Sequence, residues 1–118
     1  MIQGEGFTID ESKFDYFFGR VTSNPHNTER SWRNYEGLRR LGIEETTGGR
    51  ERLLQIFQSG LNQPIIDRKE NSYGITLVRK VEIDRGSLQG SIEISYFYTD
   101  GDLESIPKIS SIITKIYK

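Results

Sequence analysis

The hydrophobic pattern of this chain changes its period near Gln63. Before that point apolar residues recur every three or four positions, and after it they alternate with polar residues. The first spacing buries one face of a helix and the second buries one face of a strand. This order predicts three N-terminal helices followed by a three- to four-stranded antiparallel sheet, an α+β fold. Because 118 residues are the usual size of one domain, we expect residues 1–118 to form a single domain.

The first two helices are predicted from apolar stripes and capping residues. Asp10 or Ser12 caps the first helix. Its stripe consists of Phe14, Phe17, Phe18 and Val21. An Asn-Pro pair caps the second helix, which begins close to His26 and ends at Gly42. The apolar side of the second helix, which we expect to face the core, consists of Trp32, Tyr35, Leu38 and Leu41.

The remaining elements follow from the same two periods. Thr46 or Thr47 caps a third helix that runs to about Ser59. Its buried side consists of Leu53, Leu54, Phe57 and Leu61. The alternating segments that predict strands are residues 73–83, 89–98 and about 109–117, with a short edge strand at 64–66.

One face of the second helix is a candidate site. His26, Arg30 and Asn34 recur at i, i+4 and i+8, so they form a polar stripe, and Ser31 lies beside it. Histidine can give and take a proton near neutral pH, and His26 is the only histidine of the chain. Arginine can hold a phosphate, while the amide and the hydroxyl can orient it. In the alternative interpretation, His26 is a structural residue that bonds backbone or water at the helix start.

The same region concentrates positive charge. Residues 20–40 contain five arginines and two glutamates, Glu29 and Glu36. The arginines are Arg20, Arg30, Arg33, Arg39 and Arg40. The planar guanidinium suits phosphate, although the last three can equally solvate a helix surface. The net charge of -1 argues against a general nucleic-acid-binding protein, so affinity for a polyanion must come from a local patch such as this one.

Arg79 is a second anomaly. It interrupts the otherwise apolar row of alternate residues from Ile75 to Ile83. A charge on a core-facing position needs partners. Arg79 is therefore either a structural strut paired with a carboxylate, or a member of a site in which it holds phosphate together with Arg30.

Several classes of site lack the necessary residues. The chain has no cysteine and one histidine, which excludes disulfides, cysteine zinc sites and all-histidine metal sites. Neither Gly4–Gly6 nor Gly48–Gly49 has the neighbours of a phosphate-binding glycine loop. We expect neither a cofactor nor a metal. No signal peptide and no run of 18 apolar residues is present, so we expect no membrane partner and no autonomous export.

The residues that remain fit metal-independent cleavage of RNA. That reaction needs a base for the ribose 2′-hydroxyl, an acid for the leaving 5′-oxygen, and cations for the charge that develops on the phosphate. His26 supplies the acid or base, and Arg30 and Arg79 supply the cations. The predicted catalytic residues are therefore His26, Arg30 and Arg79.

A motif in the first half of the chain resembles known toxins. The string Phe-Asp-Tyr-Phe-Phe-Gly-Arg at 14–20 is followed by His-Asn, Arg-Ser, Asn and Leu-Gly-Ile as far as Ile43. This is similar to the C-terminal toxin domains of bacterial polymorphic toxins, including those of contact-dependent growth inhibition. Similarity continues, more weakly, to about residue 113. The positions that match are His26, Asn27, Arg30, Ser31, Asn34 and Arg79.

The resemblance implies a fold, an activity and a partner. It implies the barnase, EndoU, colicin and RelE-like ribonuclease fold, cleavage of RNA, commonly tRNA, and a cognate immunity protein that covers the site. The chain departs from the pattern by extra residues between Asp100-Gly101 and Ser110-Ser111. This departure puts a catalytic Ser or Thr on the last strand in doubt.

The prediction is therefore a monomeric, metal-independent toxin ribonuclease. The substrate-binding residues are expected to be Asn27, Ser31, Arg33 and Asn34. We expect such a domain to be secreted as the tip of a larger protein and to act in the cytoplasm of a target cell, or to be cytoplasmic if free-standing. The alternative is a non-catalytic module whose arginine-rich second helix docks a protein partner.

Overall fold

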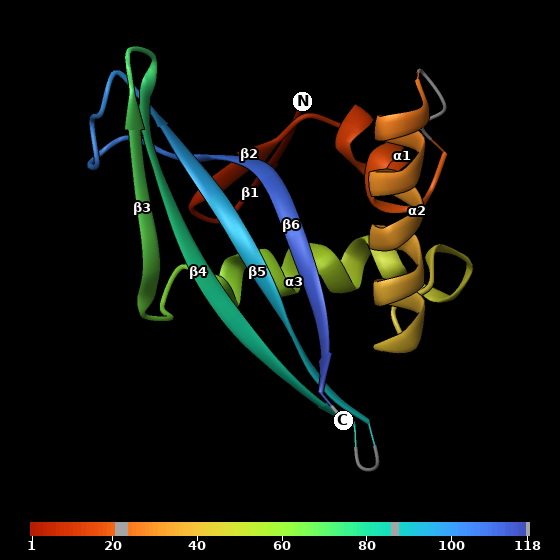
Figure 1. Ribbon diagram of the computed structural model, residues 1–118. Coiled ribbons are helices and arrows are strands. Elements are labelled where there is room, and N and C mark those ends of the chain that lie inside the picture. The colour runs from red at the N-terminus through yellow and green to blue at the C-terminus, as the bar shows by residue number, and fades with distance from the viewer. Residues whose placement is uncertain (21–23, 86–87, 118) are drawn as a thin grey trace.

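The computed structural model describes residues 1–20, 24–85 and 88–117 (Figure 1). The helices are α1 (Ser12–Phe17), α2 (Pro25–Arg40), the 3-10 helix η1 (Glu45–Thr47) and α3 (Gly49–Gly60). The strands are β1 (Ile2–Gly4), β2 (Phe7–Ile9), β3 (Ile65–Asn71), β4 (Gly74–Arg85), β5 (Leu88–Thr99) and β6 (Lys108–Tyr117). None of the helices described combines the length and the hydropathy that a membrane crossing requires.

The strands form one six-stranded sheet in the order β1-β2-β6-β5-β4-β3. From β3 to β6 each strand pairs antiparallel with the next along the chain. At the other edge β2 runs parallel to β6, with Thr8 opposite Lys108 and Ile9 opposite Ile109. The sheet is therefore mixed and larger than predicted, and two strands precede the first helix. The prediction of three N-terminal helices followed by a three- to four-stranded antiparallel sheet was wrong.

The two missed strands are too short for a periodicity argument. Each has three residues, and in β2 only Phe7 and Ile9 show the alternation, as buried residues on either side of a half-buried Thr8. Their place in the sheet depends on pairing with β6 at the other end of the chain. A local sequence pattern contains no information about such a distant partner.

The helices α2 and α3 pack on the same face of the sheet. Val81, Ile92 and Thr114 lie in register on three adjacent strands and share that face. α3 approaches Val81 through Gly60, and α2 approaches Thr114 through Gly37. No helix of the described part of the chain covers the opposite face, which is turned to the viewer in Figure 1. The core therefore lies between the sheet and these two helices.

The aromatic stripe of α1 is buried, as predicted. The ring of Phe17 lies 6.2 Å from that of Phe57 in α3, which in turn lies 5.9 Å from Phe7 in β2. Both contacts are edge-to-face, the favourable geometry for aromatic pairs. Val21, the last member of the predicted stripe, lies outside the described residues. α1 thus packs against α3, which in turn packs against β2.

The orientation of α2 differs from the prediction. Trp32 is 54% exposed, whereas Ser31 and Asn34 are 0% and 8% exposed. The reason is the contact at Gly37, which brings α2 so close to Thr114 that small residues must face the sheet. Of the other three predicted core residues of this helix, Leu38 and Leu41 are buried and Tyr35 is half-buried. Asn34 therefore lies against the sheet and not on an exposed polar stripe.

The third helix starts later than predicted. Thr46 and Thr47 belong to η1, and α3 begins at Gly49 after Gly48, whose φ is +84°. Of its predicted core residues, Leu53 and Phe57 are fully buried, and Leu54 and Leu61 are partly buried against the core.

Candidate functional site

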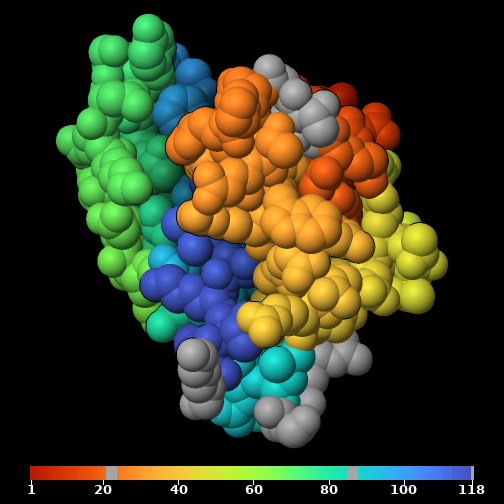
Figure 2. Space-filling view, turned by 45° about the vertical axis from the view of Figure 1, so that its right-hand side comes forward, coloured from red at the N-terminus to blue at the C-terminus, as the bar shows by residue number. Residues whose placement is uncertain are grey.

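A cleft of about 520 Å³ lies between α1, the N-terminal half of α2 and the start of β6. Figure 1 shows α1 and α2 together beside β6, and Figure 2 shows α2 running along that strand. The residues that line the cleft are Ser12, Lys13, Asp15, Tyr16, Asn27, Arg30, Ser110 and Ser111. Apart from the Tyr16 ring and the aliphatic part of the cationic side chains, these are polar groups.

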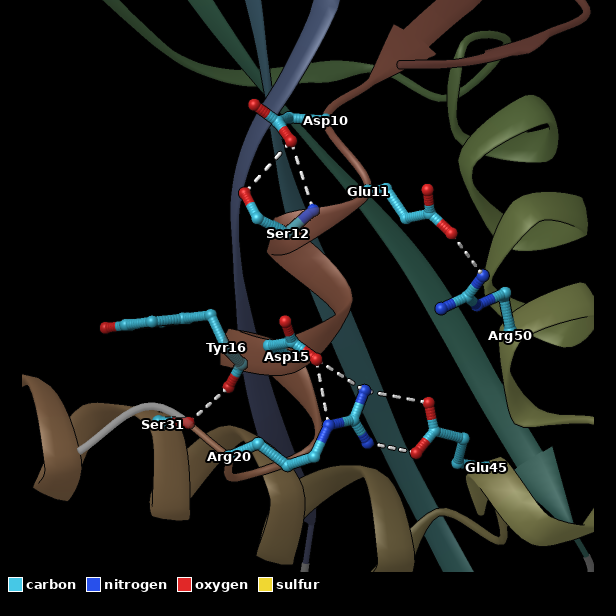
Figure 3. A network of polar contacts seen from close by, with 9 residues as sticks. All are labelled: Asp10, Glu11, Ser12, Asp15, Tyr16, Arg20, Ser31, Glu45 and Arg50. Carbon is cyan, nitrogen blue, oxygen red and sulfur yellow. Dashed lines mark hydrogen bonds and ion pairs between the residues drawn. The ribbon is translucent and has the colours of Figure 1, made fainter. Parts of the chain in front are cut away.

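The wall formed by α1 and α2 is held by a buried hydrogen bond. The hydroxyl of Ser31 donates to the backbone carbonyl of Tyr16 at 2.6 Å (Figure 3). One residue earlier on α2, the guanidinium carbon of Arg30 lies 5.9 Å from the centre of the Tyr16 ring, within range of a cation–π contact. Ser31 thus sets the position of both Tyr16 and Arg30 in the cleft.

The hydroxyl of Tyr16 is buried and has no hydrogen-bond partner among the described residues. A buried hydroxyl without a partner costs about 1–3 kcal/mol. In Figure 3 the Tyr16 ring points away from the ion pairs on the other side of α1.

The charges of the cleft leave two cations free. Lys13 and Arg30 have no carboxylate partner in the described part of the chain. Asp15, the only acid of the lining, is paired with Arg20 at 2.8 Å, and Arg20 also binds Glu45 (Figure 3). The hydrogen bonds to Glu45 and Asp15 raise the pKa of Arg20, which stays charged. The cleft is therefore a place for an anion.

Other arginines contrast with Arg30. Their pairs with carboxylates are Arg33–Glu29, Arg39–Glu36, Arg50–Glu11 and Arg68–Glu70. Only the first two of these pairs lie on α2, so the arginine-rich face predicted from the sequence is partly neutralised, and Arg40, like Arg30, has no carboxylate partner among the described residues. Arg30 keeps its charge available because α2 directs it toward the cleft.

The start of α1 is anchored on two sides, which fixes Ser12 and Lys13. The Asp10 carboxylate accepts from the Ser12 backbone N–H at 3.0 Å and from its hydroxyl at 2.9 Å, and these bonds lower the pKa of Asp10. Glu11 accepts from Arg50 of α3 at 3.2 Å (Figure 3).

The predicted site residues on α2 divide into four groups. Asn27 and Arg30 line the cleft. His26 is exposed at the start of α2, one helical turn before Arg30, and does not belong to the lining. Arg33 and Asn34 line a second cleft of about 370 Å³, between α2 and β6, to which Arg30 also belongs. The remaining predicted residue, Ser31, is fully buried.

Arg79 lies apart from these residues. It is a half-buried residue of β4, two strands from β6, on which α2 packs. Its Nη1 donates to the carbonyl of Gln63 at 2.5 Å, just after α3, and its Nε is buried without a partner among the described residues. The contact resembles a structural strut, although its partner is a carbonyl and not a carboxylate.

Six residues of the cleft were not among the predicted site residues: Ser12, Lys13, Asp15, Tyr16, Ser110 and Ser111. Lys13 and Tyr16 are spaced i, i+3 beside the aromatic stripe of α1, a signal that was available in the sequence. The extra residues before β6 put Ser110 and Ser111 in doubt, yet both line the cleft. The extra residues form the connection from β5 to β6, and the Ser110 hydroxyl donates to the carbonyl of Ser95 at 3.2 Å.

No family model matches the sequence, and no curated protein matches it. Among solved structures, the chain is similar to a chain of a contact-dependent growth inhibition toxin–immunity protein complex from Klebsiella pneumoniae 342. The superposition has a TM-score of 0.71 and covers 92% of this chain and 99% of the other. The two chains share one fold. Their sequences are 24% identical, so the similarity establishes the fold alone.

Proposed function

We propose that this chain is the toxin domain of a contact-dependent growth inhibition system and that it cleaves RNA without a metal. The observation that carries the proposal is the cleft between α1, α2 and β6, where Lys13 and Arg30 have no carboxylate partner among the described residues. Hydroxyl and amide groups surround these cations, as in a site that binds a phosphate and its sugar. The fold, shared with a chain of a toxin–immunity complex, supports the same proposal.

In this proposal Arg30 and Lys13 hold the phosphate of the bond that is cut. The ribose 2′-hydroxyl attacks the phosphorus and loses its proton to a base, while an acid protonates the departing 5′-oxygen. The products are a 2′,3′-cyclic phosphate and a 5′-hydroxyl. The cations stabilise the charge that develops on the phosphate oxygens.

His26 is the proposed acid or base. It lies one turn before Arg30 on α2 and is exposed, so it can reach a phosphate held by Arg30 at the mouth of the cleft. Asn27 and the hydroxyls of Ser110 and Ser111 are proposed to orient the substrate. The buried Ser31 is a positioning residue because its hydroxyl binds the Tyr16 carbonyl.

For Arg79 we propose a structural role. Its guanidinium binds the carbonyl of Gln63 and lies away from α2, so a phosphate held by Arg30 would need a second cation from elsewhere. Lys13 fits that need because it lines the same cleft as Arg30.

The proposed partners are RNA, of which tRNA is one candidate, and an immunity protein. An inhibitor of this cleft should be acidic, because acidic side chains would compete with RNA for Lys13 and Arg30. Its inhibition should weaken as salt is added. We further propose that the domain reaches its target cell as the tip of a larger secreted protein.

Expression in bacterial cytosol tests the proposal. The wild-type domain should arrest growth and degrade RNA, whereas His26→Ala should do neither and keep the far-UV spectrum and melting temperature of the wild type. A folded His26→Ala protein with full toxicity would remove His26 from the mechanism. A toxic wild-type domain that leaves all RNA intact would favour the alternative, a non-catalytic module that docks a protein through α2.

A further inference from the structure

The second cleft adjoins the first, because Arg30 lines both. The first cleft is polar, whereas the second combines apolar and polar groups. Its lining consists of Arg30, Arg33, Asn34, Ile112, Ile113 and Thr114. Small-molecule sites in proteins have this composition, an apolar wall with a few polar groups that fix orientation.

Asn34 gives the second cleft an unused recognition group. The residue is 8% exposed, and its side chain makes no hydrogen bond with any residue that the structure describes. Its amide atoms are not fully enclosed, so they are open to a ligand in the cleft. Its two donors and one acceptor form the pattern that pairs with the edge of a nucleobase.

The strand opposite Asn34 adds two further features. Ile113 is 54% exposed and alternates with Ile112 and Thr114, so its large apolar side chain leaves β6 toward the uncovered face of the sheet, at the rim of the cleft. β6 pairs with β2 only through Lys108 and Ile109, so beyond Ile109 its edge toward α2 has no strand partner in the described part of the chain. Backbone N–H and C=O groups on this edge are available to a planar polar ligand.

We propose that the second cleft binds one unpaired nucleobase of an RNA strand whose phosphate is held at Arg30. Asn34 and the free edge of β6 contact the edge of the base, and Ile113, whose side chain leaves β6 toward the uncovered face of the sheet, contacts the base at the rim of the cleft. Bases in A-form duplex RNA do not present their edges in this way, so the substrate is single-stranded at the cut. The inference rests on the proposed function, and it adds the substrate class and the specificity-determining residue Asn34.

The test uses short oligoribonucleotides that differ in the base on either side of the cleaved bond. The wild type should prefer one base at one of these positions by about tenfold, the discrimination expected of a single base contact. Asn34→Ala should lose this preference and raise KM about tenfold, with kcat within about twofold. Ile113→Ala, a change of an exposed residue, should raise KM several-fold. Ile66→Ala is the matched control, because Ile66 is 47% exposed on β3 at the opposite edge of the sheet. This variant should change neither the base preference nor KM.

A binding measurement keeps this inference separate from the proposed catalysis. Oligonucleotides with 2′-O-methyl groups cannot be cut, and their affinity should show the same base preference, lost in Asn34→Ala. Equal base preference in wild type and a folded Asn34→Ala protein would overturn the inference, as would equal affinity for a duplex of the same sequence. Affinity for single strands with no cleavage of any RNA would contradict the proposed function and leave the base subsite standing. Unchanged affinity in Ile113→Ala and Asn34→Ala, with loss of immunity-protein binding in both, would assign this cleft to the protein partner.

Discussion

Gly37 of α2 lies directly against Thr114 of β6. A Cβ atom at Gly37 would come within 1.8 Å of the Thr114 Oγ1 and 2.5 Å of its Cβ. Glycine is therefore required for the distance between helix and strand. That distance sets the width of the groove that Arg30 and Asn34 line with residues of β6.

Gly37→Ala should push α2 away from β6. We expect the free energy of unfolding to fall by about 1–3 kcal/mol, the usual cost of overpacking, although alanine favours helix formation. The rate of RNA cleavage should fall by more than the loss of folded protein explains, because the groove changes shape. Urea unfolding of Gly37→Ala, Thr114→Gly and the double variant should give a favourable coupling between the two changes, since Thr114→Gly removes the clashing atoms. Strict additivity of the two changes would contradict the close contact.

Lys13 and Arg30 should both contribute to the salt dependence of RNA binding. Each alanine substitution should lower the slope of log affinity against log salt by about 0.7, the effect of one phosphate contact on a single strand. Arg68→Ala is the control, because Arg68 is paired with Glu70 on β3, at the far edge of the sheet. Titration of uncleavable RNA at several salt concentrations measures these slopes. An equal loss in Arg68→Ala would mean that binding depends on total charge and not on the cleft.

Arg79→Lys separates the two roles considered for this residue. Lysine keeps a donor for the Gln63 carbonyl but loses the planar guanidinium. A strut predicts near wild-type activity in Arg79→Lys, together with a loss of about 1.5 kcal/mol of stability in Arg79→Met, which removes the hydrogen bond. Measurements of RNA cleavage and of urea unfolding on both variants distinguish the structural role from the phosphate-binding role. A large loss of activity in a stable Arg79→Lys protein would restore Arg79 to the phosphate site.

Tyr96 should make stability decrease at alkaline pH. Its hydroxyl donates to the carbonyl of Phe57 at 2.6 Å in the core, and burial raises its pKa above the ordinary value of 10. Because the folded state keeps the proton, this contribution is complete below pH 10 and decreases as the pH rises above it, by at most about 1.4 kcal/mol per pH unit. Tyr96→Phe should be about 1 kcal/mol less stable at pH 7 and should lose less stability between pH 9 and 11. Parallel pH curves for the two proteins would contradict this assignment.

The sequence predicted those elements whose periodicity extends over many residues. The strands β4, β5 and β6 were found by alternation over ten or more residues, and α1 by the stripe that includes Phe14 and Phe17. The strands β1 and β2 were missed because three residues show no period. The predicted rotation of α2 was wrong. The contact of Gly37 with Thr114 decides which face of the helix is buried, and the aromatic character of Trp32 does not.

The candidate site was also predicted only in part, because spacing along the sequence relates residues within one element and not residues of different elements. Asn27 and Arg30 share one helix, so spacing alone places them near each other. Ser110 and Ser111 reach the same cleft through tertiary packing of β6 against α1 and α2, which no local pattern encodes. Arg79 lies among the residues of β4 that face the core, as predicted. At Arg79 this side of the strand lies beneath α3 and not beneath the site on α2.

Cleavage of total RNA by the purified domain in EDTA tests the central claim most directly. We predict that the wild type produces discrete fragments ending in 2′,3′-cyclic phosphates, that Arg30→Ala is slower by at least about tenfold, and that Arg68→Ala matches the wild type. Cleavage that stops in EDTA and returns with added Mg²⁺, or equal rates for the wild type and Arg30→Ala, would contradict metal-independent cleavage in this cleft.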